Sequence, residues 1–79
     1  MKLFRIYETC YNAGEKISNC VYAEETTRTA EHVFNRFLLE NGFKAIDPPT
    51  YSHKHKRHTA AAFNTVYNQP VNYEIIRIW

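Results

Sequence analysis

The sequence predicts an α+β fold, in which a small single-layer antiparallel sheet packs on one main helix in the order ββα(x)β. The element x is a short helix or strand at about residues 59–68. Three segments support this prediction: residues 2–23 alternate on either side of a turn, residues 27–42 repeat their apolar side chains with helical spacing, and residues 72–79 alternate again. A chain of 79 residues is sufficient for one domain, residues 1–79, with a two-layer core.

The first two strands, residues 2–11 and 16–23, are expected to form a β-hairpin around a two-residue turn at Ala13 and Gly14. On one face this register pairs Cys10 with Ile17, Glu8 with Asn19, Ile6 with Val21 and Phe4 with Ala23. On the other face it pairs Tyr11 with Lys16, Thr9 with Ser18, Tyr7 with Cys20, Arg5 with Tyr22 and Leu3 with Glu24. The first set is mostly aliphatic, so it is predicted to pack on the helix.

The helix at residues 27–42 has an apolar stripe, a start signal and a stop signal that agree. Thr26 or Thr27 can cap its first amides, and Asn41-Gly42 provides a left-handed exit. The stripe consists of Ala30, Val33, Phe34, Phe37 and Leu38. It is expected to bury Phe4, Ile6, Ile17 and Val21 of the hairpin.

The segment after the helix is harder to assign. Residues 43–46 suit a short extended piece, and Asp47-Pro48-Pro49 is expected to prevent a continued strand or helix. A polar, cationic loop should then occupy residues 50–58. Residues 59–68 suit a strand, but their alanines favour a short helix slightly.

The last strand, residues 72–79, is predicted to lie beside the first, so that the strands run in the order 2-1-last. Ile76 and Ile78 would share one face. The other face would hold Tyr73, Ile75, Arg77 and Trp79.

Composition restricts the class of protein. The hydrophobic fraction of 44% indicates a folded domain, and no apolar run is long enough to span a membrane. The N-terminus does not resemble a signal or transit peptide, so a cytoplasmic location is expected. The two cysteines, Cys10 and Cys20, are expected to be free thiols. No cofactor motif or catalytic constellation is recognisable, and we expect no enzymatic activity.

If one helix covers the sheet, the opposite face is left open. It would carry Arg5, Tyr7, Tyr11, Tyr22, Tyr73, Arg77 and Trp79. Aromatic residues interleaved with arginines on an open sheet are used by proteins that bind single-stranded nucleic acid. The alternative, which we favour, is that these residues pack against residues 59–68 or against a neighbouring subunit.

A second candidate is the basic segment at residues 52–58, which contains Lys54, His55, Lys56 and Arg57. Such a segment can contact phosphates or an acidic protein groove, and a purely solubilising loop deserves equal weight. Its three histidines have a spacing that could suit a metal, but the intervening cations would repel a divalent ion. No metal site is therefore expected.

The strand pair at residues 2–23, the helix entry Glu24-Glu25-Thr26-Thr27 and the final strand together resemble the layout of small accessory proteins encoded by phages, including type I anti-CRISPR proteins. This resemblance covers the order of elements along most of the chain. It implies a non-enzymatic inhibitor that docks on a host protein–RNA complex, in the cytoplasm of the host. No functional residue is carried over from those proteins.

The sequence thus favours a non-enzymatic binding protein of phage or mobile-element type that inhibits or redirects a host nucleoprotein complex. One alternative is direct binding of single-stranded nucleic acid, and another is a small endoribonuclease. The partner would be a host protein or protein–RNA complex, with direct nucleic-acid contact an option and no membrane contact; the protein itself would be a monomer or homodimer. The candidate binding residues are Lys54, Lys56, Arg57, His55, Arg5, Tyr7, Tyr22, Arg77 and Trp79.

Overall fold

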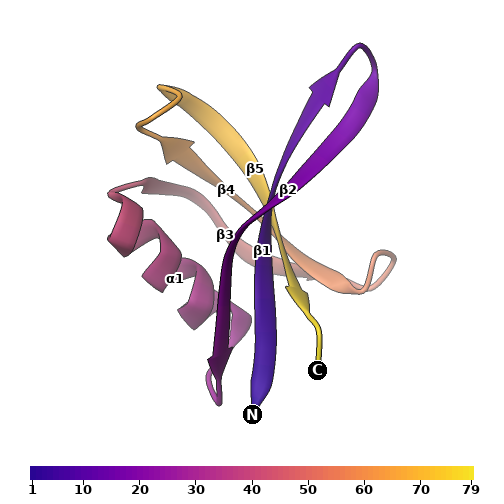
Figure 1. Ribbon diagram of the computed structural model, residues 1–79, viewed down its shortest axis with the longest axis vertical. Helices are drawn as coiled ribbons and strands as arrows, with labels where there is room; N and C mark the ends of the chain where they lie inside the picture. Colours follow the sequence, from indigo (N-terminus) through magenta and orange to yellow (C-terminus); the bar gives the residue numbers. More distant parts are fainter.

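A computed structural model describes residues 1–79. Its elements are β1 (Lys2–Asn12), β2 (Glu15–Thr26), α1 (Ala30–Asn41), β3 (Lys44–Ser52), β4 (Arg57–Asn64) and β5 (Gln69–Arg77). The five strands form one antiparallel sheet in the order β2-β1-β5-β4-β3, and α1 packs across one face of it (Figure 1). The predicted α+β class is confirmed, and so is the last strand beside the first. The layout ββα(x)β is wrong, because two full strands separate the helix from the last strand.

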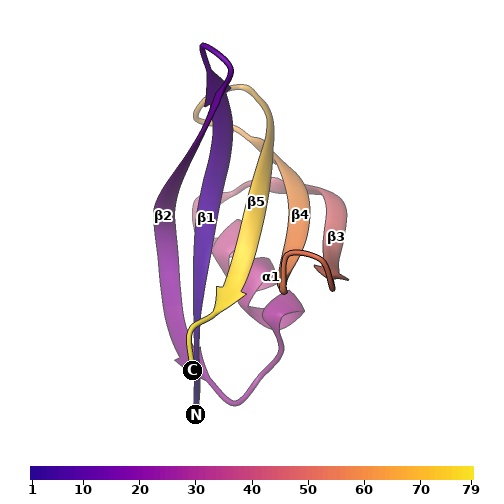
Figure 2. The same cartoon turned by 90° about the vertical axis from the view of Figure 1, so that its right-hand side faces the viewer.

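The core lies between α1 and the sheet. All five residues of the predicted helical stripe are buried there, together with Phe4 and Ile6 of β1, Ala60 and Ala62 of β4, and Val71, Tyr73 and Ile75 of β5. Figure 2 views the sheet from its other side, with α1 behind β5 and β4. No element of the chain covers this second face.

The helix begins later than predicted. Its N-cap is Thr29, whose Oγ1 accepts a hydrogen bond of 3.2 Å from the amide of His32. Thr26 instead accepts from the amide of Arg28 and shapes the preceding bend. The predicted exit is confirmed, since Gly42 is left-handed with φ 69°. The helix is too short and too polar to cross a lipid bilayer.

The hairpin register is right near the turn and wrong beyond a bulge. From Tyr11 with Lys16 to Tyr7 with Cys20 the pairs are as predicted, but the register shifts between Ile6 and Tyr7. The observed pairs beyond it are Ile6 with Tyr22, Arg5 with Ala23, Phe4 with Glu24 and Leu3 with Glu25. One extra residue in β2 therefore transfers Tyr22 to the helix side of the sheet.

The outer half of the hairpin projects beyond the helix, as the free β1–β2 turn in Figure 1 shows. Ile17 and Val21, which were expected under the helical stripe, remain 36% and 40% exposed. The prediction was wrong because α1 has only 12 residues, and the strands are longer than the surface that it can cover.

Strand β3 continues through Asp47-Pro48-Pro49, where the sequence predicted a break. It pairs only with β4 and forms the edge of the sheet, and its register shifts twice, between Ala45 and Asp47 and between Asp47 and Thr50. An edge strand tolerates proline because the N–H groups on its outer side have no partner strand. On the inner side the two register shifts leave positions without a ladder hydrogen bond, and proline, which has no N–H, can occupy them.

For residues 59–68 the expected short helix is wrong, and the alternative, a strand, is right as far as Asn64. Strand β4 runs to Asn64, and residues 65–68 turn the chain into β5. The alanines that suggested a helix lie in a strand instead. Ala60 and Ala62 are buried beneath α1, and their small side chains allow the helix to pack close to the sheet.

Strand β5 has the predicted alternation but the opposite orientation. Tyr73 and Ile75 face the helix and are almost fully buried, so Tyr73 is not on the uncovered face. Arg77 shares their side of the strand. The error has a simple cause: alternation shows which residues share a face but does not show which face the helix covers.

Candidate cationic binding site

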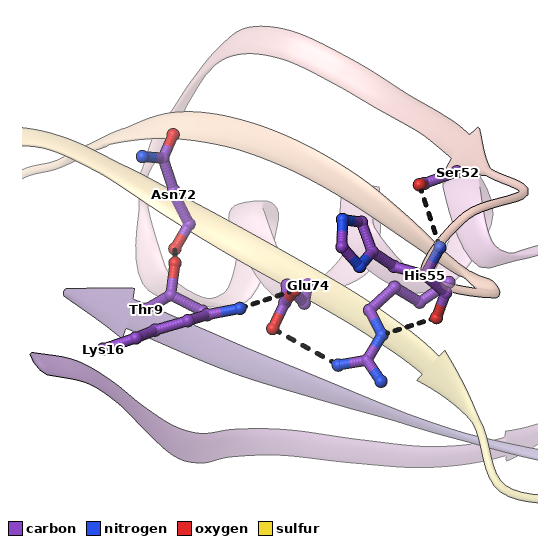
Figure 3. A network of polar contacts seen from close by, with 7 residues as sticks. Thr9, Lys16, Ser52, His55, Asn72 and Glu74 are labelled. Atoms are coloured by element: carbon purple, nitrogen blue, oxygen red, sulfur yellow. Dashed lines mark hydrogen bonds and ion pairs between the residues drawn. The ribbon is translucent and has the colours of Figure 1, made fainter. Parts of the chain in front are cut away.

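The basic segment is a tight hairpin turn instead of a long loop. Strand β3 extends to Ser52 and β4 begins at Arg57, which leaves only residues 53–56 in the turn. The hydroxyl of Ser52 accepts a hydrogen bond of 3.3 Å from the amide of His55 (Figure 3), and Lys56 closes the turn with φ 54°. The sheet therefore holds the predicted residues Lys54, His55 and Lys56 at one fixed end of the molecule.

Arg57 reaches over the uncovered face of the sheet and joins an ion-pair network around Glu74. Its Nη1 lies 3.6 Å from Oε1 of Glu74, and its Nε donates to the carbonyl of His55 at 3.0 Å. Lys16 binds the other carboxylate oxygen of Glu74 at 3.1 Å, as Figure 3 shows. Much of the charge of Arg57 is therefore balanced within the chain.

A groove of about 420 Å³ lies on the other side of the sheet, where α1 begins. Its walls come from distant parts of the sequence: the start of β1, the β3–β4 turn, the end of β5 and the first residues of α1. The lining residues are Lys2, Phe4, Thr29, Ala30, Tyr51, Lys56, Arg57, His58, Ile75 and Arg77. Four of them are cationic and none is a carboxylate, so the groove is suited to an anionic group.

Two of the cations have positions set by main-chain oxygens. Nζ of Lys2 donates to the carbonyl of Arg28 at 2.9 Å, which holds the ammonium group at the entrance to α1. Nε of Arg77 donates to a main-chain oxygen of Trp79 at 3.1 Å, and its two Nη groups make no hydrogen bond within the chain. No Asp or Glu side chain forms an ion pair with either cation, so the ammonium group of Lys2 and the Nη groups of Arg77 can contact a ligand.

One wall of the groove is aromatic. Tyr51 makes edge-to-face contacts with His53 and His58, with ring centroids 4.9 Å and 5.1 Å apart. Tyr51 is 45% exposed, whereas burial lowers the pKa of His58 below the ordinary value for histidine. At neutral pH His58 is therefore an uncharged aromatic side chain, and the charge of the groove comes from lysine and arginine.

The start of α1 adds two hydrogen-bond donors to this end of the molecule. The amides of Ala30 and Glu31 precede the first intrahelical bond, which Val33 donates to Thr29, and neither amide has an acceptor within the chain. Such amides carry the positive end of the helix dipole. They complement the cationic side chains without forming a site alone.

The aromatic and arginine-rich open face that the sequence suggested does not assemble. Arg5 and Tyr7 do lie on the uncovered face, but Tyr22 packs on Phe37 on the helix side. Trp79 is exposed beyond the end of β5. The centre of the open face instead carries small and polar side chains, namely Thr59, Ala61, Asn72 and Glu74.

Of the alternative interpretation, the part in which residues 59–68 cover the open face is wrong, because these residues belong to β4 and its turn; packing against a neighbouring subunit stays a prediction. Of the predicted binding residues, Lys56, Arg57 and Arg77 meet at the groove. Sequence reasoning missed Lys2, Tyr51 and His58. The composition of residues 51–58 could have indicated the last two, but only the pairing of β1 with β5 brings Lys2 to them.

No three histidine, cysteine, aspartate or glutamate side chains are grouped so that they could hold a metal ion. The fold and the groove define a five-stranded, one-helix α+β domain with a cationic, carboxylate-free groove. The chain matches no protein-family model, and no curated protein or solved structure is significantly similar to it.

Proposed function

We propose that the protein is a non-enzymatic binding protein that docks on a host nucleoprotein complex and inhibits or redirects it, as a small accessory protein of phage or mobile-element type. The observation that supports docking is the groove, in which Lys2, Lys56 and Arg77 converge without an ion-pair partner from an Asp or Glu side chain, beside Arg57, which is paired with Glu74. The setting of a phage or mobile element comes only from the order of elements expected from the sequence, which the additional strands alter, whereas the groove is the surface that supports docking.

The charge distribution supports a directed electrostatic contact. The whole chain has a net charge of +2, so the four groove cations leave a net charge of −2 on all other residues. Opposite local charges orient a molecule as it approaches a charged partner, and they accelerate correct encounters more than they add to affinity. The groove would therefore face the anionic surface of the complex.

A capture experiment from host lysate tests the proposal. The immobilised protein should retain a defined set of host proteins, and the variant Lys56→Glu/Arg77→Glu should lose them. The control Arg5→Glu/Lys44→Glu has the same net charge but leaves the groove unchanged, so it should retain the partner. Absence of any specific partner, or equal loss with both variants, would contradict the proposal.

A further inference from the structure

We propose that the groove binds the phosphodiester backbone of a single-stranded nucleic-acid segment, and that Tyr51 stacks on a base beside it. This inference rests on the proposed function, because it names the component of the nucleoprotein complex that the groove contacts. Neither Lys2 nor Tyr51 was assigned a role by the sequence.

The donors of the groove suit a phosphate group. Nζ of Lys2 is held by the carbonyls of Thr27 and Arg28, Nε of Arg77 is held by a main-chain oxygen of Trp79, and the Nη groups of Arg77 remain free to donate. An arginine fork can donate two parallel hydrogen bonds to phosphate oxygens, and a lysine adds a compact charge. Lys56 lines the groove from the β3–β4 turn, so cations surround the space from several sides.

The aromatic wall favours nucleic acid over an acidic peptide. A chain of carboxylates would use only the cations, whereas a nucleotide also presents a flat base next to each phosphate. Tyr51 lines the same groove as Lys2, Lys56 and Arg77 and keeps almost half of its surface exposed. Stacking on aromatic side chains tolerates any base, because every base has a π-face.

The geometry also favours an unpaired strand. In a duplex, both faces of each base are covered by neighbouring bases, so an aromatic side chain stacks only on a base that is unstacked. The rings of His53 and His58 meet Tyr51 at interplanar angles of 79° and 70° and restrict its rotation. Little side-chain entropy is then lost when a base stacks on it.

Fluorescence anisotropy with a labelled oligouridylate tests the inference at low salt. The wild-type protein should bind the single strand more tightly than a duplex of equal length, and salt should weaken the binding steeply. Lys56→Ala/Arg77→Ala should reduce the salt dependence as well as the affinity. Tyr51→Ala should weaken binding about ten-fold or more, because one base loses its stacking partner. Tyr51→Phe should restore it.

The matched control is Tyr11→Ala, which removes an exposed tyrosine from β1 outside the groove and should leave binding unchanged. Circular dichroism and thermal melting establish that each variant is folded. Failure to bind the oligouridylate at low salt overturns the inference, and so does equal binding of duplex and single strand with no effect of Tyr51→Ala. Host proteins captured after nuclease treatment would preserve the proposed function in that case, whereas no captured partner at all would overturn both.

Discussion

The side-chain amide of Asn64 donates a hydrogen bond of 3.1 Å to the hydroxyl of Tyr73 within the buried core. The amide oxygen of Asn64 accepts from the backbone amides of Val66 and Tyr67 at 2.9 Å and 3.0 Å. The ring of Tyr73 packs on Phe34 and Phe37 of the helix. One asparagine therefore connects the β4–β5 turn to the aromatic centre of the core.

The first prediction concerns this asparagine. Asn64→Ala should lower the free energy of unfolding by about 1–3 kcal/mol, because it removes both turn contacts and leaves a buried hydroxyl without its donor. Tyr73→Phe removes only the bond between the two side chains and should cost about 1 kcal/mol. Urea denaturation measures both values. Equal stability of Asn64→Ala and the wild type would show that the turn does not depend on this residue.

The second prediction tests the bulge in β2. The hydroxyl of Tyr22 lies 2.7 Å from Glu24 and 2.9 Å from Glu40, and donates its single proton to one carboxylate at a time. Burial, followed by these two carboxylates, raises the pKa of Tyr22 above the ordinary value for tyrosine. Tyr22→Phe should therefore reduce stability by about 1 kcal/mol, since it breaks the link between β2 and α1.

Tyr7→Phe is the control for Tyr22→Phe, because Tyr7 lies on the opposite face and its hydroxyl makes no hydrogen bond within the chain. Its stability should match the wild type in the same denaturation assay. If the two variants had the same stability, Tyr22 would not be held on the helix side.

The third prediction is a pH dependence. The pKa of His58 is lowered in the folded state by burial, so the unfolded state binds more protons as pH falls through the ordinary histidine range. The contribution of His58 to stability should be present above about pH 6.5 and decrease as the solution is acidified below it. Urea denaturation across this range should show a smaller decrease for His58→Phe than for the wild type. His55→Gln, in the exposed turn, should retain the wild-type decrease.

The fourth prediction concerns the network on the uncovered face. Glu74→Gln removes the carboxylate that binds Lys16 and Arg57 and should cost about 1 kcal/mol, because the side chain of Glu74 is only 12% exposed while its partners are more accessible. The same change releases the guanidinium group of Arg57, so affinity for an anionic ligand should increase. Denaturation at low and high salt measures the first effect, which salt should reduce. Unchanged stability at low salt would contradict this role of Glu74.

The sequence predicted only the start of β3 and offered β4 as an alternative to a helix, because two local signals oppose these strands and tertiary structure overrides them. Pro48 and Pro49 normally interrupt a sheet, but β3 is an edge strand and needs few of its amides. The alanines of β4 favour a helix in isolation, but Ala60 and Ala62 provide the smooth surface on which α1 rests. Neither edge position nor contact with the helix is encoded in the local pattern.

The residues of the cationic groove, like the strands, could be predicted only in part. The basic character of Lys56 and Arg57 is visible in the sequence, and Arg77 was a candidate from its strand. These three residues lie near Lys2 only because β5 pairs with β1 on one side and with β4 on the other. This pairing brings the start of the chain next to its last strands. The partner of Arg57, Glu74, belongs to another strand and could not be assigned in advance.

The sequence by itself determined the α+β class, the helical stripe, the glycine exit at Gly42 and the hairpin turn at Ala13-Gly14, because each follows from local periodicity or a local backbone requirement. Tertiary structure alone decided which face of each strand the helix covers. A single bulged residue moved Tyr22 to the helix side, and packing with α1 placed Tyr73 there too. Alternation is symmetric between the two faces of a sheet, so only contacts between distant segments can break that symmetry.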